Sequence, residues 1–258
     1  MTPVQVHEGD SPVILGLPHT GTHVPPGLWK RLNPLGQTLA DTDWHIERLY
    51  DGLLPGATTV RATFHRYVID ANRPPDGASL YPGQNTTGLC PVTDFDGHPI
   101  WVQEPGADEI EDRRARFHAP YHAALAEQVA RVHARHGYAV LYDCHSIRSR
   151  IPFLFDGELP VFNIGTLNGT TCAGWVQQVT ARHCRASGLP TVENGRFKGG
   201  WTTRHYGRPA DGIHAIQMEL AQRAYLAAES PPWTYAAPER LRATLRAILS
   251  DLADGASL

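Results

Sequence analysis

The fold is decided by the stretch Ala139-Val140-Leu141-Tyr142-Asp143-Cys144-His145-Ser146, an apolar run that ends abruptly in an acid and an imidazole. An apolar run of this length after a long helical segment predicts a buried strand of a parallel sheet. Open α/β folds place their chemistry at the carboxyl ends of such strands. There Asp143 and His145 each need a partner, because an unpaired buried polar group costs roughly 1–3 kcal/mol. Two interpretations follow: His145 binds a metal or moves a proton, or it is a hydrogen-bonded structural histidine.

Length and composition bound the class of protein. With 258 residues, 41% of them hydrophobic, the chain can bury a substantial core, and we expect a single α/β domain spanning residues 1–258. A net charge of -3 gives no basic footprint for nucleic acid. No apolar stretch approaches the roughly 18 residues of a membrane span, and the first ten residues do not resemble a signal peptide. We therefore expect a cytoplasmic protein with a small-molecule substrate and no nucleic-acid or membrane partner; its oligomeric state stays open.

The cysteines do not indicate a disulfide framework or a zinc ribbon. The four, Cys90, Cys144, Cys172 and Cys184, are widely scattered and form no C-x-x-C pair, so reduced thiols are expected. A thiol hydrolase using Cys144 with a histidine is an alternative chemistry. A cysteine inside a buried apolar strand, however, is usually inert.

The layout around His145 recurs near the N-terminus. The apolar run from Pro12 to Leu17 stops at a Gly- and Pro-punctuated loop that carries His19 and His23, so two predicted strand tips offer imidazoles. Further extended segments are expected at 57–62, 67–70, 153–155 and 161–165. Helices are expected within 28–39 (with a turn), at 108–136 (with an interruption at Pro120), at 173–187 and at 238–253.

Acidic side chains lie near the start of another predicted helix. Asp41 or Thr42 is expected to cap it, which places Asp43 in the first turn and Glu47 one turn further along the same side. Its buried face would carry Ile46, Leu49, Tyr50 and Leu53. Acids are common in first helical turns because of the helix dipole, so position alone does not make Asp43 a ligand.

Cationic side chains occur in two parts of the chain that are expected to form loops. Arg73 comes directly after the extended segment 67–70 and suits a carboxylate bidentately; saturating nearby carbonyls is the alternative. Residues 76–105 are rich in Gly, Pro and Asn and too long for a passive connector, so we expect a substrate-side lid or wall. The Gly-rich segment 194–206, with Lys198 and Arg204, is typical of a loop that meets an anion.

A carboxylate inside a late apolar run completes the set. Glu219 lies within 214–220, where it is costly unless it is paired, near a metal or protonated. A zinc hydrolase needs three imidazole or carboxylate ligands, an open position for water and a separate carboxylate to take the proton. The inventory supplies these groups, although the chain has no compact motif such as H-E-x-x-H.

Motifs along nearly the whole chain carry a resemblance to a known family. They are residues 18–21 (PHTG), 41–45 (DTDWH), 66–74 (RYVIDANRP), 81–88 (YPGQNTTG), 95–97 (FDG), 143–149 (DCHSIRS), 194–200 (NGRFKGG), 203–207 (TRHYG) and 212–220 (GIHAIQMEL). In these motifs the sequence resembles the N-formylglutamate amidohydrolases, which cleave N-formyl-L-glutamate to formate and glutamate in histidine degradation. The resemblance implies a zinc carboxypeptidase-like α/β fold: a mixed, mostly parallel central sheet with helices on both faces.

The resemblance also implies roles for individual residues. The implied ligands of a divalent metal, with Zn2+ as the expected ion, are His19, Asp43 and His145. Asp41 and Glu47 stay open as alternatives for the middle ligand, and Glu219 would be the general base. The implied substrate-binding residues are Asn72 and Arg73 for one carboxylate, Arg148 and Lys198 for a second, and Arg204 for the oxyanion. The alternatives are an amidohydrolase for another N-acyl amino acid and a non-catalytic binding protein with the same fold.

Overall fold

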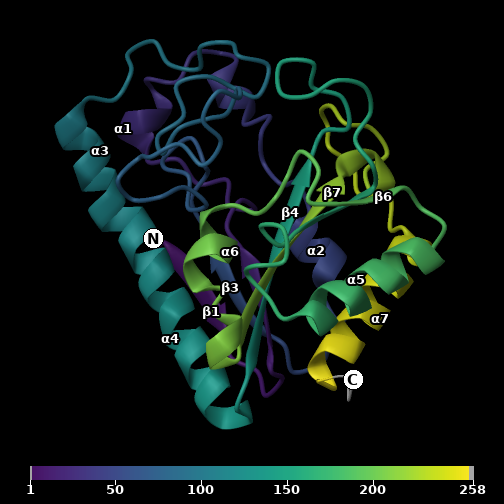
Figure 1. Cartoon of the computed structure of the whole chain (residues 1–258). Helices are drawn as coiled ribbons and strands as arrows, with labels where there is room; N and C mark the ends of the chain where they lie inside the picture. The colour runs from purple at the N-terminus through teal and green to yellow at the C-terminus, as the bar shows by residue number, and fades with distance from the viewer. Residues whose placement is uncertain (1, 256–258) are drawn as a thin grey trace.

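Seven strands form one mixed sheet in the order β1-β3-β2-β4-β7-β5-β6 (Figure 1). The structure, a computed structural model, describes residues 2–255. The strands are β1 (Val4–His7), β2 (Val13–Leu17), β3 (Thr58–Ala62), β4 (Ala139–Ile147), β5 (Phe162–Gly165), β6 (Thr191–Glu193) and β7 (Ile213–Ala221). Strands β3, β2, β4 and β7 run parallel, whereas β1 is antiparallel to β3 and β5 is antiparallel to β7. The expected mixed, mostly parallel sheet is confirmed.

Helices cover both faces of the sheet, as Figure 1 shows. They are α1 (Pro26–Trp29), α2 (Ile46–Tyr50), α3 (Ala107–Arg113), α4 (Ala119–His136), α5 (Gly174–Ala186), α6 (Trp201–Tyr206) and α7 (Glu239–Ala253). α4 and α6 lie on one face, and α2, α5 and α7 lie on the other. Among residues 2–255, none of these helices combines the length and apolarity that crossing a membrane requires.

Alternation along β4 assigns its side chains to two cores. Val140, Tyr142 and Cys144 pack in the core that includes residues of α5 and α7. Leu141 points the opposite way, into the core that includes residues of α4. Because side chains alternate along a strand, Asp143 and His145 share the face of Leu141. The polar tip of β4 therefore faces the side of the sheet that α4 and α6 cover.

The long predicted helix is interrupted next to its proline. α3 continues into a π-helical segment, Arg114–His118, and α4 begins directly after it with Pro120 in the first turn. A proline lacks the backbone N–H and its ring clashes with the carbonyl four residues earlier, so a wider turn before it removes the conflict. Gly137, at φ +76°, ends α4 in the left-handed conformation and leads into β4.

Several local predictions are wrong. Residues 67–70 form a turn and irregular chain instead of a strand, because β3 is already paired on both sides and Tyr67, Val68 and Ile69 pack in the α4-side core. Residues 153–155 are also a turn. The helix expected from Asp41 begins only at Ile46: the main-chain N–H of Asp43 donates to the His19 carbonyl, and His45 adopts φ +60°, which breaks helical geometry.

Candidate metal centre and its cavity

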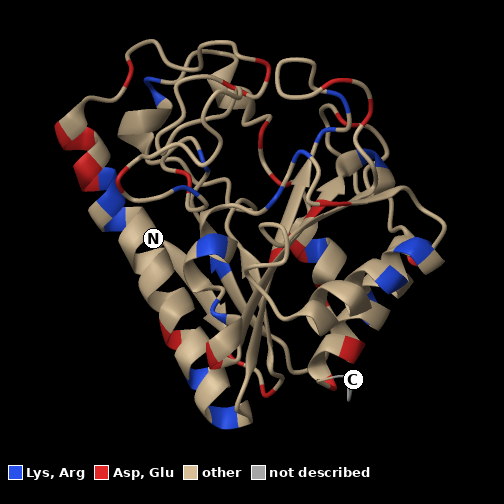
Figure 2. Ribbon diagram, viewed as in Figure 1, with Lys and Arg blue, Asp and Glu red and all other residues tan. Residues whose placement is uncertain are grey.

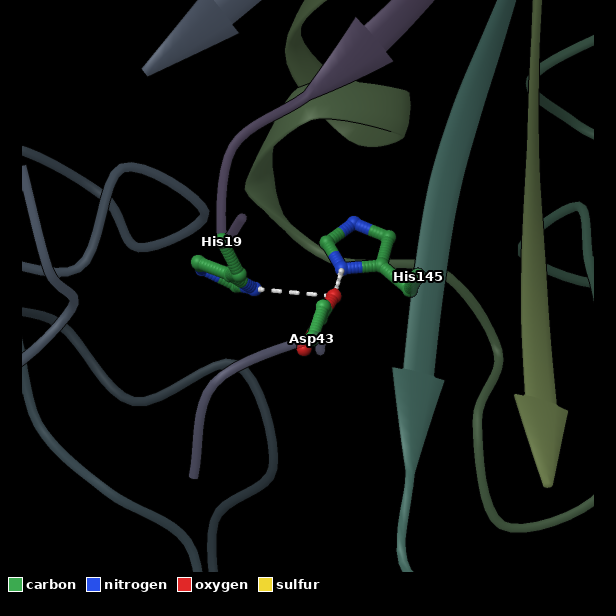
Figure 3. Close-up of side chains that lie close together, drawn as sticks. All are labelled: His19, Asp43 and His145. Carbon is green, nitrogen blue, oxygen red and sulfur yellow. Dashed lines mark ion pairs between the residues drawn. The ribbon is translucent and has the colours of Figure 1, made fainter. Parts of the chain in front are cut away.

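Two imidazoles and one carboxylate converge at the carboxyl edge of the parallel strands (Figure 3). His19 follows β2, His145 lies near the end of the neighbouring β4, and Asp43 comes from the loop before α2. Oδ2 of Asp43 lies 3.3 Å from Nδ1 of His145 and 3.8 Å from Nδ1 of His19. All three side chains are at least 97% buried, with 2%, 1% and 3% exposure for His19, Asp43 and His145.

Each imidazole is held on its far side by a second carboxylate. Nε2 of His19 donates to Oδ1 of Asp70 at 2.7 Å, and Nε2 of His145 donates to Oδ2 of Asp143 at 2.9 Å. A carboxylate partner on one ring nitrogen fixes the ring and leaves the other nitrogen free to bind a metal. Both Nδ1 atoms therefore face Asp43.

The three residues fit a divalent metal. Their ligand atoms, two imidazole nitrogens and a carboxylate oxygen, lie within 4.8 Å of one another. Among the described residues, the buried Nδ1 of His19 and Oδ1 of Asp43 have no hydrogen-bond partner. Unsatisfied buried atoms are costly, and a cation shared by these donors would satisfy them. Nitrogen and oxygen donors of this kind are typical zinc ligands.

Burial and neighbouring charges move the pKa values of the two rings in opposite directions. Burial lowers the pKa of His19, and the positive charge of Arg66 lowers it further. At His145 burial acts in the same sense, but the carboxylates of Asp143 and Asp43 outweigh it and raise the pKa. A bound cation would replace the proton that these carboxylates stabilise on His145.

The main chain orients the Asp43 carboxylate toward the two imidazoles. The N–H of Ser146 donates to Oδ2 of Asp43 at 3.1 Å. Asp41 points elsewhere, since its carboxylate accepts hydrogen bonds from the Tyr67 hydroxyl at 2.8 Å and the Phe95 N–H at 2.9 Å. Glu47 is one-third exposed and lies 3.8 Å from Arg61. Asp41 and Glu47 are therefore not part of the cluster.

The register of the sheet brings Glu219 beside His145. The β4–β7 pairing aligns His145 with Glu219 and Asp143 with Gln217, so these side chains share one face. Nε2 of Gln217 donates to Oε2 of Glu219 at 3.0 Å. Burial raises the pKa of Glu219 to about 8, against the opposing charge of His145. The buried Glu219 carboxyl group, whose burial is costly without a partner, thus has a hydrogen-bond donor and a neighbouring imidazole.

A cavity of about 60 Å³, open to solvent, lies against these groups. Its lining combines the imidazoles and Glu219 with three arginines and several residues of the segment 76–105. The lining residues are His19, Arg66, Asn72, Arg73, Tyr81, Thr86, Thr87, Phe95, His145, Ser146, Ile147, Leu154, Arg196, Phe197, Gly200, Gln217 and Glu219. Between β3 and α3 the chain has no helix or strand, and it forms one wall of this cavity, as we expected for 76–105.

Asn72 and Arg73 both reach the cavity, but they make different contacts. Nδ2 of Asn72 lies 3.0 Å from Nε2 of His145 and 3.5 Å from Oδ2 of Asp143, so the amide spans the imidazole–carboxylate pair. A Cβ atom on Gly200 would lie 2.3 Å from this amide, which requires glycine there. Nε of Arg73 donates to the Thr87 carbonyl at 2.8 Å. Arg73 thus saturates a carbonyl and still borders the cavity.

The other three predicted cations do not line the cavity. Nε of Arg204 donates to the Gly199 carbonyl, Arg148 pairs with Asp96 at 2.7 Å, and Lys198 lies on the adjoining loop. Sequence reasoning missed Arg66 and Arg196, which do line it. Both stand inside the family motifs, but an arginine in a loop carries no periodic signal that tells which way it points.

Two histidines fasten the loop that carries Asn72. Nε2 of His118 donates to the Arg73 carbonyl at 3.0 Å, and Nε2 of His122, one helical turn later, donates to the Ala71 carbonyl at 2.8 Å. Burial lowers the pKa of both imidazoles, to about 3 for His122, which keeps them neutral. The end of the π-helical segment and the first turn of α4 therefore hold the backbone on both sides of Asn72.

The thiol alternative has no support in this geometry. All four cysteines are free and buried. Burial raises the pKa of Cys144 well above its ordinary value, which disfavours the reactive thiolate. Its side chain also points into the core on the face opposite to His145.

Fold and site together define a class: a mixed α/β protein with a buried imidazole–carboxylate cluster beside an arginine-lined cavity at the carboxyl edge of its sheet. The sequence model of the N-formylglutamate amidohydrolases matches residues 11–226. The chain belongs to the N-formylglutamate amidohydrolase family, and the expected resemblance is confirmed.

Individual relatives agree with this assignment. The chain is 45% identical over 250 residues to an N-formylglutamate deformylase of Pseudomonas aeruginosa, covering 95% of this chain and 93% of the relative. It is 45% identical over 233 residues to an N-formylglutamate deformylase of Pseudomonas putida, covering 89% and 86%. The crystal structure of an N-formylglutamate amidohydrolase from Ralstonia eutropha JMP134 matches with a TM-score of 0.84 at 25% identity, covering 99% and 98%.

Proposed function

We propose that this protein hydrolyses the formamide bond of N-formyl-L-glutamate and releases formate and L-glutamate. The family and the two relatives named as deformylases support this substrate. The observation that carries the proposal is the arrangement at the sheet edge. His19 and His145 turn their Nδ1 atoms toward Asp43, and Glu219 lies beside His145 in the same cavity.

In this proposal His19, Asp43 and His145 hold a divalent metal, with zinc as the expected ion. When bound in such a site, the ion lowers the pKa of water toward 7 and polarises a carbonyl oxygen. Asp70 and Asp143 keep the two rings oriented through their Nε2 atoms. Their role is to position the ligands.

Glu219 is the proposed general base. It accepts a proton from the attacking water, whose oxygen bonds to the formyl carbon, and then returns the proton to the nitrogen as the C–N bond breaks. Gln217 holds the Glu219 carboxylate in place. Arg66 lies 3.8 Å from Asp43 and lines the cavity, so its positive charge stabilises the negative charge that develops on the formyl oxygen.

The remaining cations of the cavity favour an anionic substrate. We propose that Arg73 binds a carboxylate, because its guanidinium borders the cavity and is anchored to Thr86 and Thr87. Asn72 is proposed to border the same position, where its Nδ2 donates to the Asp143 carboxylate that holds His145.

Formate release from N-formyl-L-glutamate by the purified protein tests the proposed function. We expect turnover that exceeds turnover of N-acetyl- and N-succinyl-L-glutamate in the same preparation. Faster hydrolysis of either analogue would identify an amidohydrolase for a different N-acyl amino acid. Saturable binding of all three without any release would identify a binding protein and contradict the proposal.

A further inference from the structure

One of the three cavity arginines has no acidic partner. Arg66 lies 2.8 Å from Oδ2 of Asp70, and Arg73 lies 3.8 Å from the same oxygen. Among the described residues, no carboxylate lies within 4.0 Å of the Arg196 guanidinium. The cavity therefore presents a positive charge that this part of the protein does not neutralise.

Arg196 is nevertheless held in a fixed orientation. Its Nε donates to the Leu154 carbonyl at 2.9 Å, and one terminal nitrogen donates to the Asn85 carbonyl at 2.8 Å. The guanidinium lies over the rings of Tyr81 and Phe197, 5.4 Å from each centroid. Carbonyls and aromatic faces orient a cation without cancelling its charge.

The electrostatic setting of Arg196 favours an anion. Burial lowers the pKa of its guanidinium, and the nearby charge of Arg73 lowers it further. Both effects destabilise the charged form, and an anion bound to the Arg196 guanidinium would offset them. A carboxylate matches the planar fork of an arginine and can accept two hydrogen bonds from it.

Two arginines, Arg196 and Arg204, lie over the Tyr81 ring, and they differ in whether they reach the cavity. Arg204 lies 5.0 Å from the centroid of Tyr81, but its Nε and one terminal nitrogen donate to the carbonyls of Gly199 and Leu80. Arg204 does not line the cavity, whereas Arg196 does. Of the two arginines on this ring, Arg196 is the one placed to meet a ligand.

We propose that Arg196 is a specificity-determining residue: it binds one carboxylate of a dicarboxylate substrate, and Arg73 binds the other. This inference rests on the proposed function, which supplies a substrate with two carboxylates. The two guanidinium groups are held by hydrogen bonds to different residues: Arg73 donates to Thr87, and Arg196 donates to Leu154 and Asn85. Selectivity for a dicarboxylate then requires both arginines.

Three substrates separate the two carboxylate positions. They are N-formyl-L-glutamate, N-formyl-L-glutamine, which lacks the side-chain carboxylate, and the α-amide of N-formyl-L-glutamate, which lacks the main-chain carboxylate. In Arg196→Gln and in Arg73→Gln we expect KM for N-formyl-L-glutamate to rise about 10- to 100-fold, with kcat within about threefold. A remote carboxylate contact acts equally in the ground and transition states, so KM carries the effect.

The proposal predicts that each variant is insensitive to the loss of one substrate carboxylate, and that the two variants differ in which one. Each variant should show the wild-type KM for the one amide that lacks its own carboxylate, and the two variants should differ in which amide that is. Arg196→Lys keeps the charge without the planar fork, so its KM should lie between those of the wild type and Arg196→Gln. Arg150→Gln changes an exposed arginine outside the cavity and should leave all three KM values unchanged.

Two results would overturn the inference. One is an equal loss, or no loss, on all three substrates in Arg196→Gln and Arg196→Lys, each checked for folding by circular dichroism. The other is sensitivity of both variants to the same carboxylate. Failure of the proposed function is visible separately, because the wild-type protein would then release no formate from N-formyl-L-glutamate.

Discussion

At the scale of single residues, the candidate site depends on carboxylates with different roles. Asp43 faces both Nδ1 atoms, while Asp70 and Asp143 hold the outer nitrogens of the rings. Glu219 stands apart from these contacts, with Gln217 as its hydrogen-bond donor. The chemistry proposed for Glu219 is therefore separable from metal binding by mutation.

Glu219→Gln is expected to abolish turnover without loss of metal. Removing a general base typically costs 10²- to 10⁴-fold in rate, so kcat for formate release should fall by about that factor. The isosteric amide keeps the cavity filled, and zinc content measured by atomic absorption should stay at the wild-type level. Gln222→Ala is the control variant, because Gln222 is a buried polar side chain on the same part of the chain that does not line the cavity. Normal turnover in Glu219→Gln would show that another group takes the proton.

Which of these residues the sequence could identify depends on the signal that each one carries. His19 and His145 were recognisable because each follows an apolar run that predicts a strand. Asp43 could not be separated from Asp41 and Glu47, since the distinction rests on tertiary hydrogen bonds to Ser146 and Tyr67. A first-turn acid looks the same in the sequence whether or not it meets an imidazole.

At the scale of elements, the central strands were predictable and the edges were not. β2, β4 and β7 are buried along their whole length, so composition alone indicates them. β1 and β6 are short and largely unburied, and α6 lies in a Gly-rich segment that indicated a loop. Tyr67, Val68 and Ile69 pack in the core that α4 covers, and local sequence cannot distinguish this burial from burial in a strand.

The contact between α4 and the loop around Asn72 predicts a stability change with pH. The folded-state pKa of His122, about 3, lies below the unfolded value of 6.5. Between pH 6.5 and pH 3, His122 therefore binds more protons in the unfolded chain than in the folded one. The stability that neutral His122 contributes above pH 6.5 is lost as the pH falls toward 3. Between pH 7 and pH 5 this residue should remove about 2 kcal/mol from the free energy of unfolding.

His122→Gln isolates this contribution, because glutamine can donate to the Ala71 carbonyl without titrating. Urea unfolding at pH 7 and pH 5 should show a smaller loss of stability in the variant than in the wild type. The exposed His7 on β1 provides the matched control, His7→Gln, which should keep the wild-type difference. An identical loss in His122→Gln and the wild type would mean that His122 does not carry it.

At the scale of the whole molecule, the site is assembled from segments far apart in sequence. The loop after β2, the loop before α2, the tip of β4 and the end of β7 supply its members. Figure 2 shows that the strands carry few charged residues, while charged residues are frequent in helices and in the loops at one end of the sheet. Parallel strand order explains why His19 and His145 converge at one edge of the sheet. Which arginines line the cavity depends on loop packing, which the sequence does not predict.

A metal ion bound by segments that lie far apart in the sequence should stabilise the folded protein. Binding to the folded state alone adds about 2.7 kcal/mol at a free metal concentration of 100 times Kd. For a chain of this length we therefore expect chelation to lower Tm by about 5–10 °C in differential scanning calorimetry. The same drop should occur in Glu219→Gln and should vanish in His145→Ala. An unchanged Tm after complete metal removal from the wild type would contradict a metal that ties these segments together.

The central claim is that His19, Asp43 and His145 hold a divalent metal, and an anomalous difference map tests it most directly. Crystals of active, zinc-loaded protein measured on both sides of the zinc absorption edge should show a peak within about 2.3 Å of Nδ1 of both histidines and a carboxylate oxygen of Asp43. A fully active crystalline protein with its peak elsewhere, or with no peak, would contradict the account.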